Sequence, residues 1–442
     1  MNILQITPGA GRMYCGNCLR DNALVAELRR LGHEALMVPL YLPLTLDEQD
    51  QSRGTPVFFG GVNVYLDQQW GWYRRWAPHW LRQWLAAPRL LRWASGRAAK
   101  TRAADVGELT VSMLRGEAGN QARDLEELMG WLKGQPRADV VCLSNAMLLG
   151  LAQSLGRELD APVICMLQGE DSFLDGLPPP QREVAWEILR EQARVVDRFV
   201  APSRYFAELM IRRMQLAPEK VRVVPNGISL AGFPSAPLPR PPSPPVVGYF
   251  ARMCADKGLD ILVDAFIALR RRGRVGEARL RIGGGCGPAD EPLVRQLTDR
   301  LSRAGWGGAV QWVKNPDRAA KLELLQSLSL FSVPSRYGEA FGLYVVEALA
   351  AGVPVVLPRA AAFPELIEHT GGGVLCEPEN PMSLAEALER LILNEDRRRA
   401  LAAAGHAVAH RDYGVGSMAA NMLEVFRDAR GQRALQTAGG SA

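Results

Sequence analysis

The stretch PSRYGEAFGLYVVEALAAGVP, residues 334–354, carries the clearest sign of how this chain folds. The run before it, Leu328–Val333, is short, apolar and ended by Pro334, which predicts a buried strand. From Leu343 the apolar residues recur at helical spacing until Gly352 stops them. The stretch therefore predicts a strand followed directly by a helix, the building unit of an α/β fold.

The start of this helix is a predicted anion site. The backbone amides of Phe341, Gly342 and Leu343, together with the helix dipole, can hold phosphate oxygens. Gly342 also lets a ligand approach the backbone closely. Two glutamates, Glu339 and Glu347, bracket the junction. Because a carboxylate repels phosphate, we expect both glutamates to face sugar or ribose hydroxyls instead.

A second predicted strand-to-helix junction supplies positive charge. The apolar run Val246–Phe250 is followed by Arg252 and Lys257, and a helical pattern begins at Leu259. Two cations near one point would neutralise a diphosphate. The alternative is that both are solvated surface charges, as most arginines and lysines are.

Strand patterns alternate with helical patterns along the chain, which predicts parallel sheets covered by helices on both faces. The proline-rich residues 236–245 fit neither helix nor strand and predict a stiff linker between domains. Each side of this linker opens with a strand, a loop and a helix, starting at Ile3–Thr7 and at Val246–Phe250. We therefore expect two Rossmann-like domains, residues 1–235 and 246–412.

The bulk composition is that of a soluble globular enzyme, with 442 residues, 48% hydrophobic, 22% charged and a formal net charge of +5. The chain opens on a strand pattern rather than a signal peptide, and no apolar run reaches the length of a membrane span. Seven scattered cysteines fit a reducing compartment, so we expect a cytoplasmic protein. The mild charge and the lack of a nucleic-acid module speak against nucleic acid as a partner.

Together the two junctions resemble the family-four glycosyltransferases, retaining enzymes of the GT-B fold. The family's Glu-x7-Glu pattern matches Glu339 and Glu347, and its Arg-x4-Lys-Gly pattern matches Arg252, Lys257 and Gly258. Further matches lie at residues 224–228, 352–356 and 364–367. The resemblance implies an α/β fold in which two Rossmann-like domains face each other across a cleft. It also implies that a tail helix, residues 413–430, packs back on the first domain.

The resemblance implies a nucleotide-sugar donor, a glycan or lipid-linked acceptor, and neither a cofactor nor a metal. Arg252 and Lys257 would neutralise the diphosphate, Glu339 would orient the transferred sugar, and Glu347 would bind the ribose. The expected donor-side residues are Gly16, Arg252, Lys257, Gly284, Phe341, Gly342, Leu343 and Glu347.

The first domain departs from the family at one position. Gln168 stands where the family commonly has a histidine near the reacting sugar. An amide can hydrogen-bond a sugar hydroxyl, but it cannot transfer a proton as imidazole does. We expect Gln168 to act with Glu339, Arg252 and Lys257 at the reacting centre. The nearby Glu170 and Asp171 either touch the acceptor, act as the base, or cap a helix.

Three other functions fit parts of the pattern. A dinucleotide-binding dehydrogenase fails on spacing, because Tyr14 and Pro288 stand where the fingerprint needs its third glycine. A sugar-nucleotide epimerase of the same fold would share the donor residues without an acceptor site. A non-catalytic nucleotide-sugar-binding protein is disfavoured by the complete set of two cations and two glutamates.

The segment Trp70–Arg102 has an unusual composition, with six tryptophans among arginines and no acidic residue. It predicts peripheral contact with an anionic membrane or a lipid-linked acceptor. A lid packed on the first domain and an aromatic platform for a sugar are the alternatives.

Cys15 and Cys18 have the spacing of a redox pair, but the expected fold is not that of a thioredoxin, and two cysteines cannot complete a tetrahedral metal site. We therefore expect packing roles for both.

Overall fold

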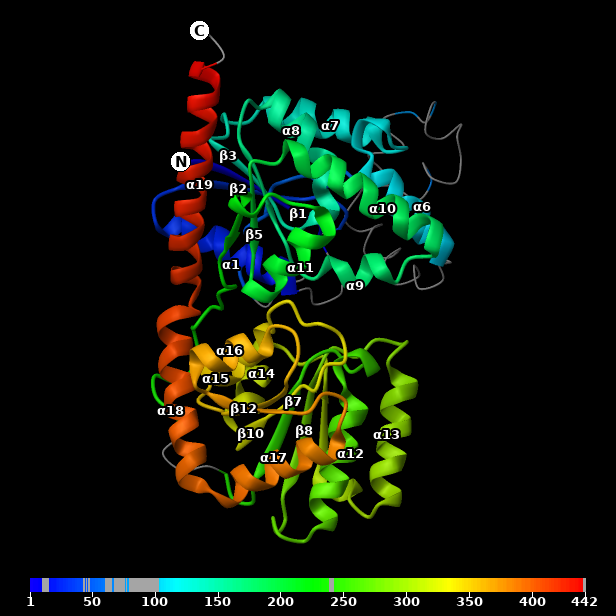
Figure 1. Cartoon of the computed structure of the whole chain (residues 1–442), viewed down its shortest axis with the longest axis vertical. Helices are drawn as coiled ribbons and strands as arrows, with labels where there is room; N and C mark the ends of the chain where they lie inside the picture. Colours follow the sequence, from blue (N-terminus) through cyan, green and yellow to red (C-terminus); the bar gives the residue numbers. More distant parts are fainter. Residues whose placement is uncertain are drawn as a thin grey trace. The chain divides into compact units, whose positions relative to one another are not determined.

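The computed structural model describes residues 1–9, 16–42, 48–59, 103–237 and 242–439, together with five isolated positions between residues 43 and 79 (Figure 1). The chain divides into two compact units. The first comprises Met1–Pro225 with Met418–Ala442, and the second comprises Asn226–Ser417.

The first unit is built on a six-stranded parallel sheet with the order β2-β1-β3-β4-β5-β6. Ile3 of β1 pairs with Ala35 on one side and with Val140 on the other, so β1 is a central strand. The order reverses between β1 and β3. The strands are β1 (Asn2–Thr7), β2 (Glu34–Pro39), β3 (Val140–Leu143), β4 (Val163–Met166), β5 (Arg198–Ala201) and β6 (Val221–Val223).

Helices cover this sheet, and their ends follow local sequence signals. Helix α11 begins after Ser203, whose hydroxyl accepts a hydrogen bond from the Phe206 amide, and it ends at Gln215 in the left-handed conformation. Helix α10 has a proline in its first turn, where no amide donor is needed. The helices are α1 (Gly16–Arg30), α6 (Ala103–Leu114), α7 (Ala122–Lys133), α8 (Ala152–Glu158), α9 (Glu170–Asp175), α10 (Pro179–Gln192) and α11 (Arg204–Met214).

The second unit repeats this plan, with a six-stranded parallel sheet of order β12-β11-β10-β7-β8-β9. Val247 of β7 pairs with Leu330 on one side and Leu280 on the other, and the order reverses between β7 and β10. The strands are β7 (Val246–Phe250), β8 (Arg279–Gly284), β9 (Val310–Lys314), β10 (Leu330–Phe331), β11 (Val355–Pro358) and β12 (Gly373–Cys376). The two parallel sheets confirm the predicted α/β class with two Rossmann-like halves.

A continuous core fills the second unit between this sheet and its helices. Helix α12 buries Leu259, Leu262 and Phe266, and the fully buried Phe331 of β10 lies in the same core. The helices are α12 (Leu259–Arg271), α13 (Glu291–Arg303), α14 (Arg318–Gln326), α15 (Leu343–Ala350), α16 (Phe363–Thr370), α17 (Pro381–Leu393) and α18 (Glu395–Asp412).

The last helix, α19 (Val415–Gly439), belongs from Met418 onward to the first unit. Its Asp428 accepts a hydrogen bond from Arg198 of β5 at 2.8 Å. Arg433 donates to the Gly156 carbonyl, also at 2.8 Å. These contacts join the tail of the chain to the sheet formed by its beginning.

The structure differs from the sequence prediction on where the first unit ends. Residues 226–235, predicted to close the first domain, belong to the second unit. The Ile228 amide donates to the Tyr413 carbonyl, and the Ile228 carbonyl accepts from the Val415 amide, both at 2.9 Å. Arg318 donates to the carbonyls of Ser229 and Ala231. These long-range hydrogen bonds tie residues 228–231 to the second unit.

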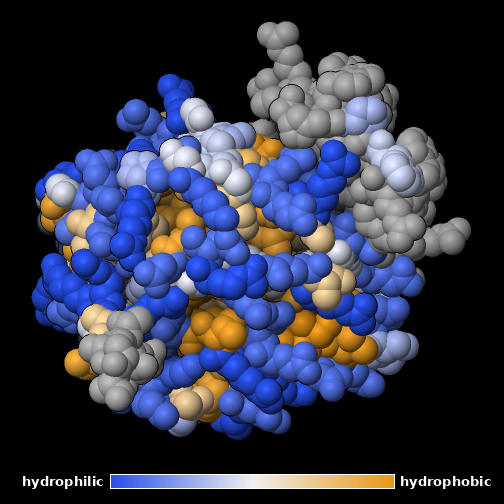
Figure 2. Space-filling view, turned by 90° about the horizontal axis from the view of Figure 1, so that it is seen from above, coloured by the Kyte–Doolittle hydropathy of each residue, from blue (hydrophilic) through white to orange (hydrophobic). Residues whose placement is uncertain are grey.

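The surface seen in Figure 2 is mostly hydrophilic, with hydrophobic residues showing between the hydrophilic ones. Over the described part of the chain, no helix is both long and apolar enough to cross a bilayer.

Candidate functional site

The strand order of the second unit defines where a ligand is expected. In open parallel sheets, ligands bind beyond the carboxyl ends of the strands at the point where the order reverses. Here that point lies between β7 and β10. The loop after β7 carries Arg252 and Lys257, and the loop after β10 carries Glu339. The two predicted junctions therefore meet at the reversal of one sheet.

The two loops are held together by close backbone contacts. Gly258 adopts a φ of +67°, and a Cβ atom there would lie 1.8 Å from the Pro334 carbonyl oxygen, so only glycine allows this approach. The Arg336 amide donates to the Asp256 carbonyl at 2.9 Å. The Arg336 guanidinium binds both carboxylate oxygens of Asp260, at 2.6 and 2.7 Å. The glycine of the Arg-x4-Lys-Gly pattern is thus explained by packing between the loops.

Lys257 and Glu339 are in direct contact, although 82 residues separate them in sequence. The Lys257 ammonium lies 2.5 Å from Oε2 of Glu339. The hydroxyl of Tyr344 donates to the same oxygen at 2.6 Å. Burial, assisted by the charge of Glu339, raises the pKa of Tyr344 well above its ordinary value. The sequence predicted the first two residues of this cluster and missed Tyr344.

Arg252 is oriented by a buried carboxylate that the sequence analysis also missed. Its guanidinium contacts Asp290, with Nη2 3.0 Å from Oδ1 and Nε 3.2 Å from both carboxylate oxygens. Asp290 is 6% exposed, and its Oδ2 accepts a hydrogen bond from the Gly287 amide. The hydrogen bond with Asp290 raises the pKa of Arg252 further above its ordinary value. Asp290 lies between the glycine-rich turn and the start of α13. This position after the turn was the only feature of the sequence that could have indicated a role for Asp290 in the site.

The predicted anion site lies at the start of α15, and anion binding there stays a prediction. Gly342 caps the helix in the left-handed conformation, with a φ of +92°. The first amides of a helix have no partner within the helix, so they are available to an anion. Phe341, which precedes Gly342, has a buried side chain that packs against the ring of Tyr413 at 5.8 Å between centroids. Leu343 is the first residue of the helix.

Glu347, one turn further along α15, pairs with a buried lysine. The Lys321 ammonium of α14 lies 2.9 Å from Oε1 of Glu347, and the two side chains are 9% and 17% exposed. Glu347 thus has a different cationic partner from Glu339, and the separate roles of the two glutamates stay a prediction.

The glycine-rich turn after β8 is explained by the fold itself. Gly284 has a φ of +132°, and a Cβ atom there would lie 1.9 Å from the Ala251 carbonyl oxygen. The Asn315 side chain holds the turn, because its Oδ1 accepts from the Cys286 amide and its Nδ2 donates to the Cys286 carbonyl. The donor-binding role predicted for Gly284 stays a prediction.

In the first unit, the predicted acceptor-side acids have contacts of a different kind. Oε1 of Glu170 accepts from the Ala146 amide at 2.8 Å, and Oε2 accepts from the Gln168 amide at 2.7 Å. Burial raises the pKa of Glu170, and these hydrogen bonds offset part of that rise. Burial also raises the pKa of Asp171. The contacts of Glu170 join the start of α9 to the loop after β3, but they do not cap α9, whose N-cap Gly169 has no side-chain hydrogen bond. The acceptor-side role of Glu170 and Asp171 stays a prediction.

Other predicted features of the first unit lie partly or wholly outside the described residues. Gly16 begins α1 and is exposed, but the loop before it, including Cys15, is outside the description. The segment Trp70–Arg102 is likewise outside it, apart from Trp76 and Pro78. Cys18 is buried and accepts a hydrogen bond from Thr7. Within the described ranges, no group of three or more His, Cys, Asp or Glu side chains could hold a metal ion.

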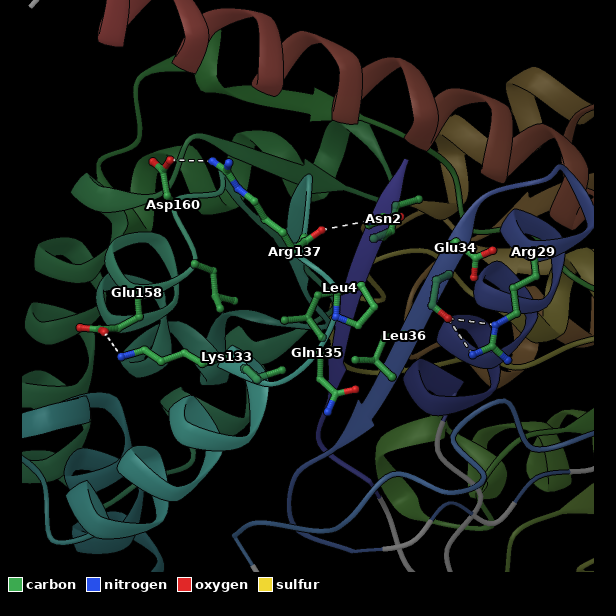
Figure 3. Close-up of a pocket in the computed structure, with 16 residues that line it drawn as sticks. Asn2, Leu4, Arg29, Glu34, Leu36, Lys133, Gln135, Arg137, Glu158 and Asp160 are labelled. Atoms are coloured by element: carbon green, nitrogen blue, oxygen red, sulfur yellow. Dashed lines mark hydrogen bonds and ion pairs between the residues drawn. The ribbon is translucent and has the colours of Figure 1, made fainter.

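A cavity of about 780 Å³ lies in the first unit at the amino ends of the strands, the opposite end from the one where ligands are expected (Figure 3). Leu4 and Leu36 contribute apolar surface. Lys133 is paired with Glu158 at 2.7 Å, and Arg137 with Asp160 at 2.8 Å. None of the predicted site residues lines this cavity.

Two family models match the chain. The model described as "Glycosyltransferase Family 4" matches residues 94–231, and the model "Glycosyl transferases group 1" matches residues 235–408.

Solved glycosyltransferase structures share the fold. HepE from Anabaena, in complex with UDP, superposes with a TM-score of 0.66 at 18% identity, covering 97% of this chain and 100% of that one. Sucrose-phosphate synthase from Thermosynechococcus elongatus superposes with a TM-score of 0.67 at 17% identity, covering 97% and 98%.

Sequence relatives point the same way. The D-inositol 3-phosphate glycosyltransferase of Xylanimonas cellulosilytica is 30% identical over 271 residues, which is 58% of this chain and 62% of the relative. D-inositol 3-phosphate glycosyltransferase 1 of Catenulispora acidiphila is 31% identical over 337 residues, which is 73% of this chain and 76% of the relative. The chain belongs to the family-four glycosyltransferases.

Proposed function

We propose that this protein is a retaining glycosyltransferase that moves a sugar from a nucleoside-diphosphate sugar to a hydroxyl acceptor. The observation that carries the proposal is the meeting of two cations, a helix start and Glu339 at the strand reversal of the second unit. A diphosphate fits the cations and the helix amides, and a sugar hydroxyl fits the carboxylate.

The chemistry follows from where charge develops. When the bond between the anomeric carbon and the diphosphate breaks, negative charge grows on the departing phosphate. Arg252, held by Asp290, and Lys257 would stabilise that charge, together with the first amides of α15. The acceptor hydroxyl then forms the new bond to the anomeric carbon on the same face, as expected for a retaining family, and its proton passes to the departing phosphate oxygen.

The two glutamates would divide the recognition of the donor. Glu339 lies beside Lys257 and would orient the transferred sugar. Glu347 lies one turn further along α15, with its Oε1 held by Lys321, and would bind ribose hydroxyls. In a nucleotide sugar, the ribose and the sugar lie on opposite sides of the diphosphate, so two different carboxylates can each bind one of them.

A binding and hydrolysis screen tests the proposal. UDP-, GDP- and ADP-sugars would be titrated against the purified chain, with UDP-sugars first, because the similar HepE structures hold UDP and UDP-glucose. We expect one nucleoside diphosphate to bind and its sugar derivative to be hydrolysed slowly without an acceptor. Because the cations serve where other enzymes use a metal, we expect turnover to persist in EDTA. Absence of binding to every member of the panel would refute the proposal.

The epimerase alternative predicts a different product from the same screen. An epimerase would convert the donor into its epimer without any acceptor, whereas a transferase releases free sugar slowly and responds to an acceptor. Chromatography of the sugar product separates the two. D-inositol 3-phosphate, named as the substrate of the sequence relatives, is a natural first acceptor to add.

We further propose a glycan or lipid-linked acceptor, with peripheral membrane contact through Trp70–Arg102. The support is sequence alone, namely tryptophans and arginines without acids. Basic residues near an anionic surface add about 1 kcal/mol each, and salt weakens the effect. Co-sedimentation with anionic vesicles, compared with neutral vesicles and with high salt, tests it. Equal recovery in the supernatant with both vesicle types would favour a soluble acceptor.

A further inference from the structure

Tyr344 occupies an unusual place in the second unit's site. It is the second residue of α15, and its hydroxyl donates to Oε2 of Glu339 at 2.6 Å. The Lys257 ammonium contacts that same oxygen at 2.5 Å and lies 5.5 Å from the centroid of the tyrosine ring. One carboxylate oxygen therefore has two partners of different kinds, a charged ammonium and a neutral hydroxyl.

The tyrosine is the more firmly held of the two partners. Its ring packs against Phe331 of β10, with 6.3 Å between ring centroids, and Phe331 is fully buried. The raised pKa of Tyr344 keeps its hydroxyl protonated, so it remains a hydrogen-bond donor near neutral pH. Lys257, by contrast, carries its ammonium on a flexible four-carbon chain and is 30% exposed.

A bound donor would change the partners of Lys257 but not those of Tyr344. A diphosphate carries more negative charge than one carboxylate, so it competes with Glu339 for the lysine. As Lys257 turns toward the phosphate, Glu339 loses part of what fixes its direction. The hydroxyl of Tyr344 can hold the carboxylate through this exchange, because a neutral donor is not drawn away by the phosphate.

We propose that Tyr344 is a positioning residue that keeps Glu339 directed at the transferred sugar while Lys257 exchanges Glu339 for the donor diphosphate. The inference rests on the proposed glycosyl transfer and adds a residue that neither the family patterns nor the sequence analysis singled out. It predicts that the tyrosine hydroxyl matters for the sugar and not for the nucleotide.

The test uses Tyr344→Phe, which keeps the ring that packs on Phe331 and removes only the hydroxyl. Tyr337→Phe is the matched control, because Tyr337 lies in the preceding loop and is 59% exposed. Free UDP, GDP or ADP, whichever the wild-type chain binds, serves as the nucleotide probe, and its glucose derivative serves as the donor. Affinity is measured by calorimetry and turnover by donor hydrolysis.

We expect Tyr344→Phe to bind the free nucleotide within twofold of wild type while kcat for donor hydrolysis falls about tenfold, in keeping with one lost hydrogen bond to a charged group. In a Glu339→Gln background, the same change should alter kcat less than twofold, because the residue acts through the carboxylate. Tyr337→Phe should change neither quantity.

Three results would overturn the inference. The first is equal kcat in Tyr344→Phe and wild type. The second is a loss of nucleotide affinity as large as the loss of kcat, which would indicate general damage to the site. The third is an undiminished effect in the Glu339→Gln background. If the wild-type chain binds none of the nucleotides, the proposed function fails first and this inference fails with it.

Discussion

The charged residues of the second unit's site and the acid pair of the first unit differ in what they are bonded to. Lys257 pairs with the side chain of Glu339, and Arg252 pairs with the side chain of Asp290, in loops at one edge of the second sheet. Both carboxylate oxygens of Glu170 instead accept hydrogen bonds from backbone amides. A cation paired with a side chain can exchange partners when a ligand arrives. A carboxylate that satisfies buried amides cannot leave without exposing them, so its first role is in folding.

The largest expected effect tests the ligand-binding side of this contrast. Lys257→Ala removes a cation from beside the departing diphosphate. We expect kcat/KM for donor turnover to fall roughly 30- to 800-fold, which corresponds to about 2–4 kcal/mol of lost transition-state stabilisation. Thermal unfolding should change little, because the ion pair with Glu339 is partly exposed. Lys314→Ala, which breaks the surface pair with Glu291, is the control. Normal turnover in Lys257→Ala would contradict the idea that the side-chain-paired cations of the second unit serve ligand binding.

The opposite behaviour is expected for Glu170→Ala. The change leaves the buried amide of Ala146 and the part-buried amide of Gln168 without their acceptor, which should lower the free energy of unfolding by about 2–3 kcal/mol. Nucleotide affinity should not change. Urea unfolding and calorimetry measure the two quantities, with Glu183→Ala on exposed α10 surface as the control. Wild-type stability combined with lost transfer would instead make Glu170 an acceptor-side residue.

A division within the second unit's site is the next effect in size. Glu347→Ala should weaken binding of the free nucleoside diphosphate by about 1–3 kcal/mol, because a ribose hydroxyl loses a charged acceptor. Glu339→Ala should leave that affinity nearly unchanged and depress turnover. Calorimetry with the free nucleotide separates them. Equal losses of nucleotide affinity would contradict the two roles.

Local patterns were enough to predict the strands and helices around the second unit's site. The apolar run before Pro334, the helical spacing after Gly342 and the position of Lys257 are all visible within a few residues of one another. The sequence therefore placed the two junctions, and strand order then brought them together. The glycines are also explained by local structure, since Gly258 and Gly342 adopt left-handed backbone conformations that other residues rarely take.

The partners of these residues could not be predicted, because a pairing between distant positions leaves no local trace. Asp290 lies 38 residues from Arg252, and Lys321 lies 26 residues from Glu347. Tyr344 lies close to Glu339, but in sequence it reads as one more large residue of a helix. The hydrogen bonds between Ile228 and residues 413 and 415, which tie residues near 226 to the second unit, are long-range in the same way.

The smallest expected effect concerns how stability depends on pH. Burial raises the folded-state pKa of Glu170 and of Asp171 above their ordinary values, so the folded chain holds these protons at a pH where the unfolded chain has released them. Stability contributed by the protonated acids is present below the unfolded pKa. It is lost as pH rises from that value through the raised folded pKa, the reverse of what a carboxylate in an ion pair shows.

Urea unfolding across this range should therefore give a smaller decline in stability for Asp171→Asn than for wild type, because one of the two groups no longer titrates. Glu183→Gln on α10 should leave the decline unchanged. If Asp171→Asn and wild type decline in parallel, burial does not govern the ionisation of this acid, and the contrast between the two units would rest on hydrogen bonding alone.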